Sequence, residues 1–174
     1  ISIRSMLGTR TGRPNLLSCD MGGTTAKACL VLGGTPPVTT EFEVDRVYRF
    51  KAGSGLPVRV PSIDLIEIGA GGGSIARVDR FGLVKVGPDS AGADPGPACY
   101  GRGGTMPTVT DADLVLGYLD AGHFLGGTMA LDLDAARRAI ATHIGTPTGL
   151  DVTGGAWAIH QVVNEAMAAA ARMH

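Results

Sequence analysis

The sequence has little of several features that mark common classes of protein. Its 174 residues carry a formal net charge of -1, so no excess of basic residues suggests a nucleic-acid partner. No apolar run approaches the roughly 20 residues of a membrane-spanning helix, and no charged-then-apolar leader opens the sequence. The three cysteines lack metal-ligand spacing, which favours reduced thiols. These absences predict a cytoplasmic protein that binds neither nucleic acid nor membrane.

Glycine, by contrast, is abundant, with 27 residues in the chain, well above the roughly 7% that is usual for proteins. The glycines are clustered rather than periodic, which excludes collagen, and the apolar residues between them exclude disorder. Clustered glycine in a chain that can fold predicts tight turns and close approaches of backbone. The chain starts at Ile1 and ends inside a helical pattern, so we expect a piece of a longer polypeptide, truncated at both ends.

The hydrophobic pattern predicts an α/β fold, with strands in the first part of the chain and helices in the last part. Residues 1–15 are expected to be a lead-in segment, and 16–174 a single domain. Strands are predicted over 16–20 and 28–32, over 39–50, in two extended segments between 58 and 68, and in a hairpin over 75–86. Helices are predicted from 110, over 135–144 and from about 155 to the end.

The expected helix ends follow from capping residues. Thr110 with Asp113 resembles a capping box at the first helix. Asp132 or Asp134 can cap the second helix, which is expected to stop at Gly145.

The run Asp20–Lys27 is the first candidate for chemistry. Its glycines, Gly22 and Gly23, allow successive backbone amides to converge on an anion. Thr24 and Thr25 add hydroxyl donors and Lys27 a positive charge, while Asp20 could hold a magnesium-bound water or orient a nucleophile. The alternative is a plain glycine turn in which Asp20 satisfies its own turn amides. The run is neither a Walker loop nor a Rossmann fingerprint.

A second glycine run, Gly69–Ser74, follows an apolar strand. So many glycines after a strand cost conformational entropy on folding, which favours a site where a ligand or another backbone segment must approach closely. One interpretation is a wall for nucleotide or substrate, made by Gly71, Gly72, Gly73 and Ser74. The other is a bulged crossing of strands, and the sequence alone does not separate the two.

The segment Gly87–Gly104 alternates prolines that stiffen the chain with glycines that permit contact, as a shaped binding loop requires. Asp89 and Asp94 could be carboxylates for a metal or substrate, although for each one singly a turn cap is favoured. Cys99 could be a nucleophile, but a buried thiol is favoured because no histidine lies near it in the sequence.

Few other polar residues are candidates for catalysis. The four histidines show no metal-ligand spacing, and His160 is interpreted as a packed or surface residue. Asp111 and Asp113 are interpreted as helix caps rather than catalysts.

Taken in order, these motifs resemble the hydantoinase A/5-oxoprolinase family over about residues 16–170. The matching stretches read DMGGTTAK, IGAGGGSIA and VGPDSAGADPGPACYGRGG, followed by PTVTDADLVLG and FLGG. The resemblance implies one lobe of an actin-like/hexokinase-like ATPase fold (ribonuclease H-like), with a mixed β-sheet and flanking helices. It would be the second lobe of an A subunit. The resemblance also implies ATP and Mg²⁺ as cofactors, a B-type (hydantoinase B-like) partner subunit, and a small cyclic-amide substrate.

The reaction that the resemblance implies is ATP-dependent opening of a cyclic amide, such as a hydantoin or 5-oxoproline, through a phosphorylated amide. Related enzymes include ATP-dependent ketone carboxylases of the acetone and acetophenone type, and a non-catalytic scaffold lobe for the B-type subunit is a further alternative. The motifs do not separate these uses. Because the cleft of such folds needs both lobes, we expect this piece alone to be inactive.

Overall fold

The computed structural model describes residues 6, 8–44, 47 and 53–173. The chain divides into two compact units, each described here by itself. The first unit comprises 1–19, 27–66 and 174, and the second comprises 20–26 and 67–173. Strands and helices both occur, which confirms the α/β class. None of the helices within the described residues has the length and apolar character needed to cross a membrane.

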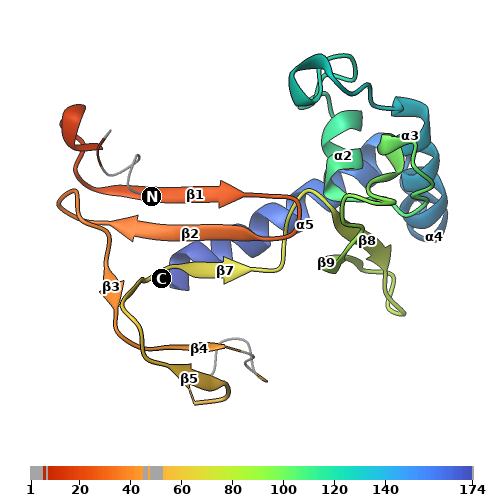
Figure 1. Cartoon of the computed structure of the whole chain (residues 1–174). Coiled ribbons are helices and arrows are strands. Elements are labelled where there is room, and N and C mark those ends of the chain that lie inside the picture. The colour runs from red at the N-terminus through yellow and green to blue at the C-terminus, as the bar shows by residue number, and fades with distance from the viewer. Residues whose placement is uncertain (1–5, 7, 45–46, 48–52, 174) are drawn as a thin grey trace. The chain divides into compact units, whose positions relative to one another are not determined.

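The first unit is built from short strands. β1 (Leu16–Met21) and β2 (Ala26–Val31) flank the glycine turn as predicted, and with β7 (Ile66–Ile68) they form a sheet in the order β1-β2-β7 (Figure 1). Two antiparallel pairs follow, between β3 (Val38–Thr39) and β6 (Ser62–Ile63) and between β4 (Phe42–Val44) and β5 (Leu56–Val58). The single strand predicted over 39–50 is therefore divided, and residues 45, 46 and 48–50 of it lie outside the described residues.

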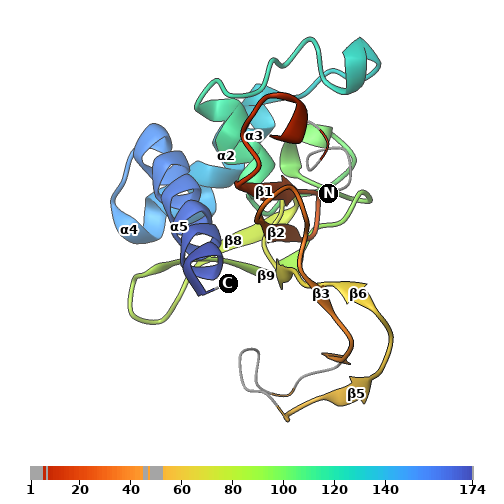
Figure 2. The ribbon, with the colours of Figure 1, turned by 90° about the vertical axis from the view of Figure 1, so that its left-hand side faces the viewer.

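The second unit packs helices on a hairpin. The hairpin is the predicted one, formed by β8 (Ser74–Val78) and β9 (Val84–Ser90). α2 (Val109–Val115), α3 (Leu133–Ile140) and α5 (Val152–Met173) lie beside one another (Figure 2). The fully buried side chains of the core include Val109, Ile140 and Ile159 from these helices and Ile144 from the turn after α3. β9 continues to Ser90, and a short helix covers Ala98–Tyr100. Part of the segment Gly87–Gly104, which was predicted to be a loop, therefore has regular secondary structure.

The prediction for the cap of α2 was wrong by two residues. Thr108, not Thr110, is the N-cap: its backbone is extended, and its side chain forms a capping box with Asp111 rather than Asp113. The hydroxyl of Thr110 instead donates to the carbonyl oxygen of Gly72 at 2.8 Å. The tertiary contact thus decides between two overlapping Thr-x-x-Asp patterns.

The prediction for the end of the second helix was also wrong. Asp132 caps α3, and its carboxylate accepts from the amide of Ala135 at 2.8 Å. The helical backbone, however, does not end at Gly145. It continues through a π-helical turn (Ala141–Gly145) and a short helix α4 (Thr146–Thr148), which ends at Gly149. Proline is tolerated at the first turn of a helix because no intrahelical N–H is needed there.

The last helix starts earlier than predicted. α5 begins at Val152, because the carboxylate of Asp151 accepts from the amide of Gly154 at 2.7 Å and so satisfies a free donor of the first turn.

Candidate functional site

The glycine turn that was predicted to carry chemistry belongs to the second unit from Asp20 to Ala26. The amide of Gly22 donates to the carbonyl oxygen of Thr25 at 2.9 Å, which closes the turn. Asp20, Gly22, Gly23 and Thr24 are exposed, and Thr25 is half-buried. The tip of the turn is therefore accessible to a ligand.

The second glycine run lies directly against this turn. The amide of Gly72 donates to the carbonyl of Gly22 at 2.9 Å, and the amide of Gly73 donates to the carbonyl of Gly23 at 2.7 Å. A Cβ atom on Gly71 would lie 2.6 Å from the carbonyl carbon of Gly23 and from the amide nitrogen of Thr24. A Cβ atom essentially never comes this close to a non-bonded backbone atom. Glycine is therefore needed because another backbone segment comes close.

These contacts decide which way the turn presents its amides. A trans peptide places its N–H on the side opposite its C=O. Since the carbonyls of Gly22 and Gly23 face the glycine run, the amides of Gly23 and Thr24 point away from it. Within the part of the chain that the structure describes, neither amide has a hydrogen-bond acceptor.

The amides of the second run are already used. Gly71 donates to the hydroxyl of Ser74 at 2.9 Å, and Ser74 donates to the carbonyl of Gly71 at 3.0 Å. Gly72 and Gly73 donate to the turn. In this structure Gly72 and Gly73 thus hold the turn, while Gly71 and Ser74 bond to each other. A direct contact between these four residues and a nucleotide stays a prediction.

The charged residues of the turn lie in different units. Asp20 belongs to the second unit and Lys27, exposed on β2, to the first. No group of three or more His, Cys, Asp or Glu side chains that could hold a metal occurs among the described residues.

The two aspartates of the Gly/Pro segment differ in their surroundings. The carboxylate of Asp89 accepts from the Arg77 guanidinium across the β8–β9 hairpin. Asp94 is exposed, next to Pro95. The segment reaches the site through its backbone instead, since the amide of Ala91 donates to the carbonyl of Gly73 at 2.8 Å.

Asp111 has a larger structural role than a cap alone. Its fully buried carboxylate accepts from the amides of Ala98 at 3.2 Å, Cys99 at 2.7 Å and Thr108 at 2.8 Å, and from the Thr108 hydroxyl at 2.8 Å. It ties the end of the Gly/Pro segment to the start of α2. The Thr-x-x-Asp pattern at 108–111 could have indicated this role, but the overlapping pattern at 110–113 was predicted to be the cap instead.

Cys99 is fully buried, as favoured from the sequence. Burial, together with the nearby Asp111 carboxylate, raises the pKa of its thiol far above the ordinary value. A thiol of this kind stays protonated at neutral pH, and the thiolate is the reactive form. The structure therefore supports a packing role.

Sequence reasoning missed a pair between Asp113 and His160, which lie 47 residues apart. The Nδ1 atom of His160 lies 3.0 Å from the Asp113 carboxylate, and the rings of Tyr118 and Trp157 stack on the imidazole at 4.9 and 5.6 Å between centroids. Burial raises the pKa of Asp113, and the hydrogen bond and charge of His160 partly oppose this. The pair joins α2 to α5.

The raised pKa of Asp113 predicts a pH dependence of stability. A group whose pKa is higher in the folded state stabilises the fold below its unfolded pKa, here about 3.8, and this contribution is lost as the pH rises through the folded pKa. The stability of the native protein relative to the Asp113→Asn variant should therefore fall as the pH rises from below about 3.8 upward through the raised pKa of Asp113. Urea midpoints of both proteins across this range measure the difference. A pH-independent difference, or one that grows in favour of Asp113, would contradict the assignment.

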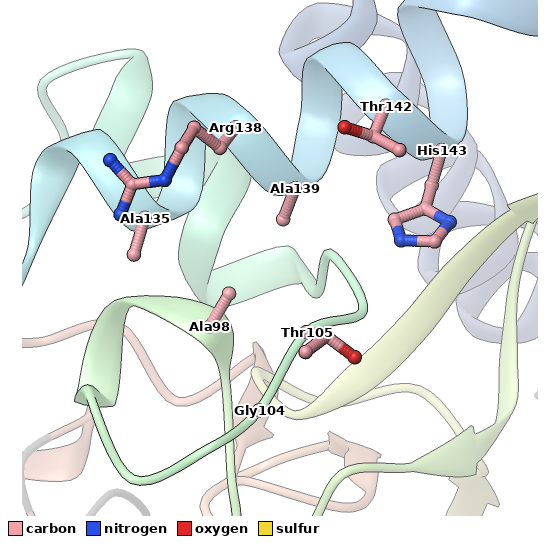
Figure 3. Close-up of a pocket in the computed structure, with 8 residues that line it drawn as sticks. All are labelled: Ala98, Gly104, Thr105, Ala135, Arg138, Ala139, Thr142 and His143. Atoms are coloured by element: carbon pink, nitrogen blue, oxygen red, sulfur yellow. The ribbon is translucent and has the colours of Figure 1, made fainter.

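A separate hollow of about 340 Å³ lies between the helical residues 135–143 and the end of the Gly/Pro segment, at Ala98, Gly104 and Thr105 (Figure 3). Ala98, Ala135 and Ala139 line it between Arg138 and His143, but the Arg138 guanidinium lies 3.8 Å from the Asp132 carboxylate. None of the residues predicted to carry chemistry lines this hollow.

The sequence pattern of the Hydantoinase/oxoprolinase family matches residues 1–174. The chain belongs to this family, which confirms the resemblance drawn from its motifs. It is 46% identical to the caprolactamase subunit alpha of Pseudomonas jessenii over 162 residues, which is 92% of this chain and 22% of that protein. It is 42% identical to the acetophenone carboxylase gamma subunit of Aromatoleum aromaticum over 163 residues, or 92% of this chain and 21% of that protein.

Solved structures give the same grouping. The nucleotide-free structure of acetone carboxylase, which carries out ATP-dependent acetone carboxylation, superposes with a TM-score of 0.82 at 29% identity, over 99% of this chain and 23% of that chain. The ATP-dependent caprolactamase of Pseudomonas jessenii superposes with a TM-score of 0.81 at 41% identity, over 99% of this chain and 24% of that chain. The chain thus spans about a quarter of the length of these relatives.

Proposed function

We propose that this chain is the phosphate-binding part of an ATP-dependent cyclic-amide hydrolase, acting as one lobe of an actin-like ATPase fold. The observation that carries the proposal is the orientation of the turn. Its carbonyls are bonded to Gly72 and Gly73, so the amides of Gly23 and Thr24 point outward at an exposed tip. Outward backbone amides on a glycine turn are the donor set that phosphate oxygens require.

The residues present fit ATP with Mg²⁺. Gly22 and Gly23 lack side chains that would crowd a phosphate, and the hydroxyls of Thr24 and Thr25 can add donors. Asp20 is exposed and would hold a water of a hydrated Mg²⁺, an ion that usually keeps several waters. Lys27 would add positive charge, and Asp89 and Asp94 remain candidates for contact with the substrate.

The reaction class follows from the relatives. Caprolactamase, by its name, acts on a cyclic amide, and its solved structure is described as ATP-dependent. ATP would supply a phosphoryl group to the amide oxygen, which would make the amide carbon more electrophilic toward water. The ring would then open as the C–N bond breaks, with the nitrogen as the leaving group. The chain's own task is to position the phosphates and neutralise their charge, which is where enzymes of phosphoryl transfer gain most of their rate. The relatives' names as alpha, beta and gamma subunits support a partner subunit, and we propose that it is of the B type.

A second candidate is an ATP-dependent ketone carboxylase. The 42% identity to the acetophenone carboxylase gamma subunit favours it specifically, because this value is close to the 46% for caprolactamase. ADP formation by the whole protein and its partner subunit separates the candidates. Dependence on a lactam, hydantoin or 5-oxoproline supports the hydrolase, whereas dependence on a ketone with bicarbonate supports the carboxylase.

The Asp20→Ala variant should lose at least about 100-fold in the rate of ADP formation, since a water-mediated metal contact at the phosphates is lost. The fold should be intact because the side chain is exposed. The measurement is steady-state ADP release with circular dichroism as the check on folding. Asp134→Ala, at an exposed position on α3, is the matched control. A folded Asp20→Ala protein with native turnover would remove Asp20 from the site.

A further inference from the structure

Thr110 donates two hydrogen bonds to one carbonyl group of the glycine run that packs against the turn. Its amide and its hydroxyl both donate to the carbonyl oxygen of Gly72, each at 2.8 Å. Thr110 is 7% exposed, so water competes little for these bonds. A Cβ atom on Gly72 would lie 2.8 Å from the Thr110 hydroxyl, which shows how closely the two residues pack.

The bonds continue from this carbonyl to the tip of the turn. The peptide that carries the Gly72 carbonyl also carries the Gly73 amide, on its opposite side. That amide donates to the Gly23 carbonyl at 2.7 Å. The peptide of the Gly23 carbonyl in turn carries the Thr24 amide, which points outward. A chain of aligned peptides therefore runs from Thr110 to Thr24.

Such a chain has two effects on its last donor. It fixes the orientation of the Thr24 peptide, because each bond constrains the plane of the next. It also polarises the Thr24 amide, since hydrogen bonds in series strengthen one another inside a protein. Thr110 donates to this chain of peptides through its side-chain hydroxyl as well as its amide. The amide of Ala91 also supports it, through the Gly73 carbonyl.

We propose that Thr110 is a positioning residue for phosphate binding, which acts on the Thr24 amide through the Gly72–Gly73 and Gly23–Thr24 peptides. The inference rests on the proposed function, in which this amide contacts a phosphate of ATP. It assigns a role to a threonine on α2 that the sequence suggested only as a helix cap. Thr110 itself does not contact the nucleotide in this account.

The test uses Thr110→Val, which keeps the shape and the amide but removes the hydroxyl, and Thr110→Ser, which restores the hydroxyl. Thr148→Val is the matched control, since the hydroxyl of Thr148 also donates to a backbone carbonyl, that of Ile144 at 2.6 Å. The whole protein with its partner subunit is assayed for kcat and KM of ATP. Hydrogen exchange is followed by mass spectrometry in the peptide covering 20–27.

Thr110→Val should lower kcat/KM for ATP roughly tenfold, as expected when a catalytic donor is slightly misplaced, and should speed exchange in 20–27. Thr110→Ser should stay within about twofold of the native value, and Thr148→Val should change neither readout. Native kcat/KM in Thr110→Val overturns the proposal, as does an equal loss in Thr110→Val and Thr110→Ser. If the native protein forms no ADP, the proposed function fails instead, and exchange in 20–27 alone then decides whether Thr110 orders the turn.

Discussion

Gly71→Ala should abolish ADP formation, with a loss of at least about 100-fold, which misplacing a catalytic group by about 1 Å can cause. The added methyl group would lie 2.6 Å from backbone atoms of Gly23 and Thr24. Backbone atoms cannot rotate out of the way as the end of a flexible side chain can. The turn must therefore shift or the glycine run must separate from it. Overpacking of this kind costs about 1–3 kcal/mol of stability, so the protein should stay folded while the tip loses its geometry.

The matched control for this prediction is Gly122→Ala. A Cβ there would meet a side-chain oxygen of Asp120 at 3.5 Å, an ordinary contact, and the residue has no left-handed backbone. ADP formation, urea midpoints and exchange in 20–27 are measured for both variants. If Gly71→Ala keeps native turnover, the close packing of the two glycine runs does not shape the site.

Asp111→Ala should lower the free energy of unfolding by about 3–5 kcal/mol, because it leaves several buried donors without an acceptor. Four hydrogen bonds converge on this carboxylate, from Ala98, Cys99 and Thr108. A loss of this size approaches the whole stability of many domains, so part of the variant protein should be unfolded at 37 °C.

Asp111→Asn tests the same contacts more gently. It keeps the volume but exchanges one acceptor oxygen for a donor, so it should cost about half as much. Asp134→Asn, on the exposed face of α3, should change stability by less than about 0.5 kcal/mol. The urea midpoint measures the stability of all three variants. A loss of stability in Asp111→Ala as small as that in the Asp134→Asn control would contradict the structural role assigned to Asp111.

The sequence predicted those features that depend on local residues. Strands on both sides of the Asp20 turn and the hairpin over 75–86 follow from alternation and turn chemistry, and the structure confirms them. The need for glycine at 71–73 was also visible. The sequence did not show that the Asp20 turn is the segment that packs against these glycines, because the contact joins segments about 50 residues apart in the chain.

Helix ends and side-chain pairs depended on tertiary contacts. Thr108 and Thr110 each begin a Thr-x-x-Asp pattern, and local sequence does not rank them. The carbonyl of Gly72 engages the Thr110 hydroxyl, which leaves Thr108 as the cap. The pair of Asp113 with His160 likewise forms only when α5 packs on α2. Residues that act through long-range packing were thus the ones that sequence reasoning misplaced.

The most direct measurement of the central claim is calorimetric titration of Mg-ATP into the whole protein and its Gly23→Ala variant. No atom lies within 4 Å of a Cβ at Gly23, so this variant should fold normally. We expect the native protein to bind Mg-ATP and Gly23→Ala to bind it at least about tenfold more weakly, because the methyl group occupies the side from which a phosphate approaches. Equal affinities in the two proteins, or no binding by the native protein, would contradict the claim that this turn holds the phosphates of ATP.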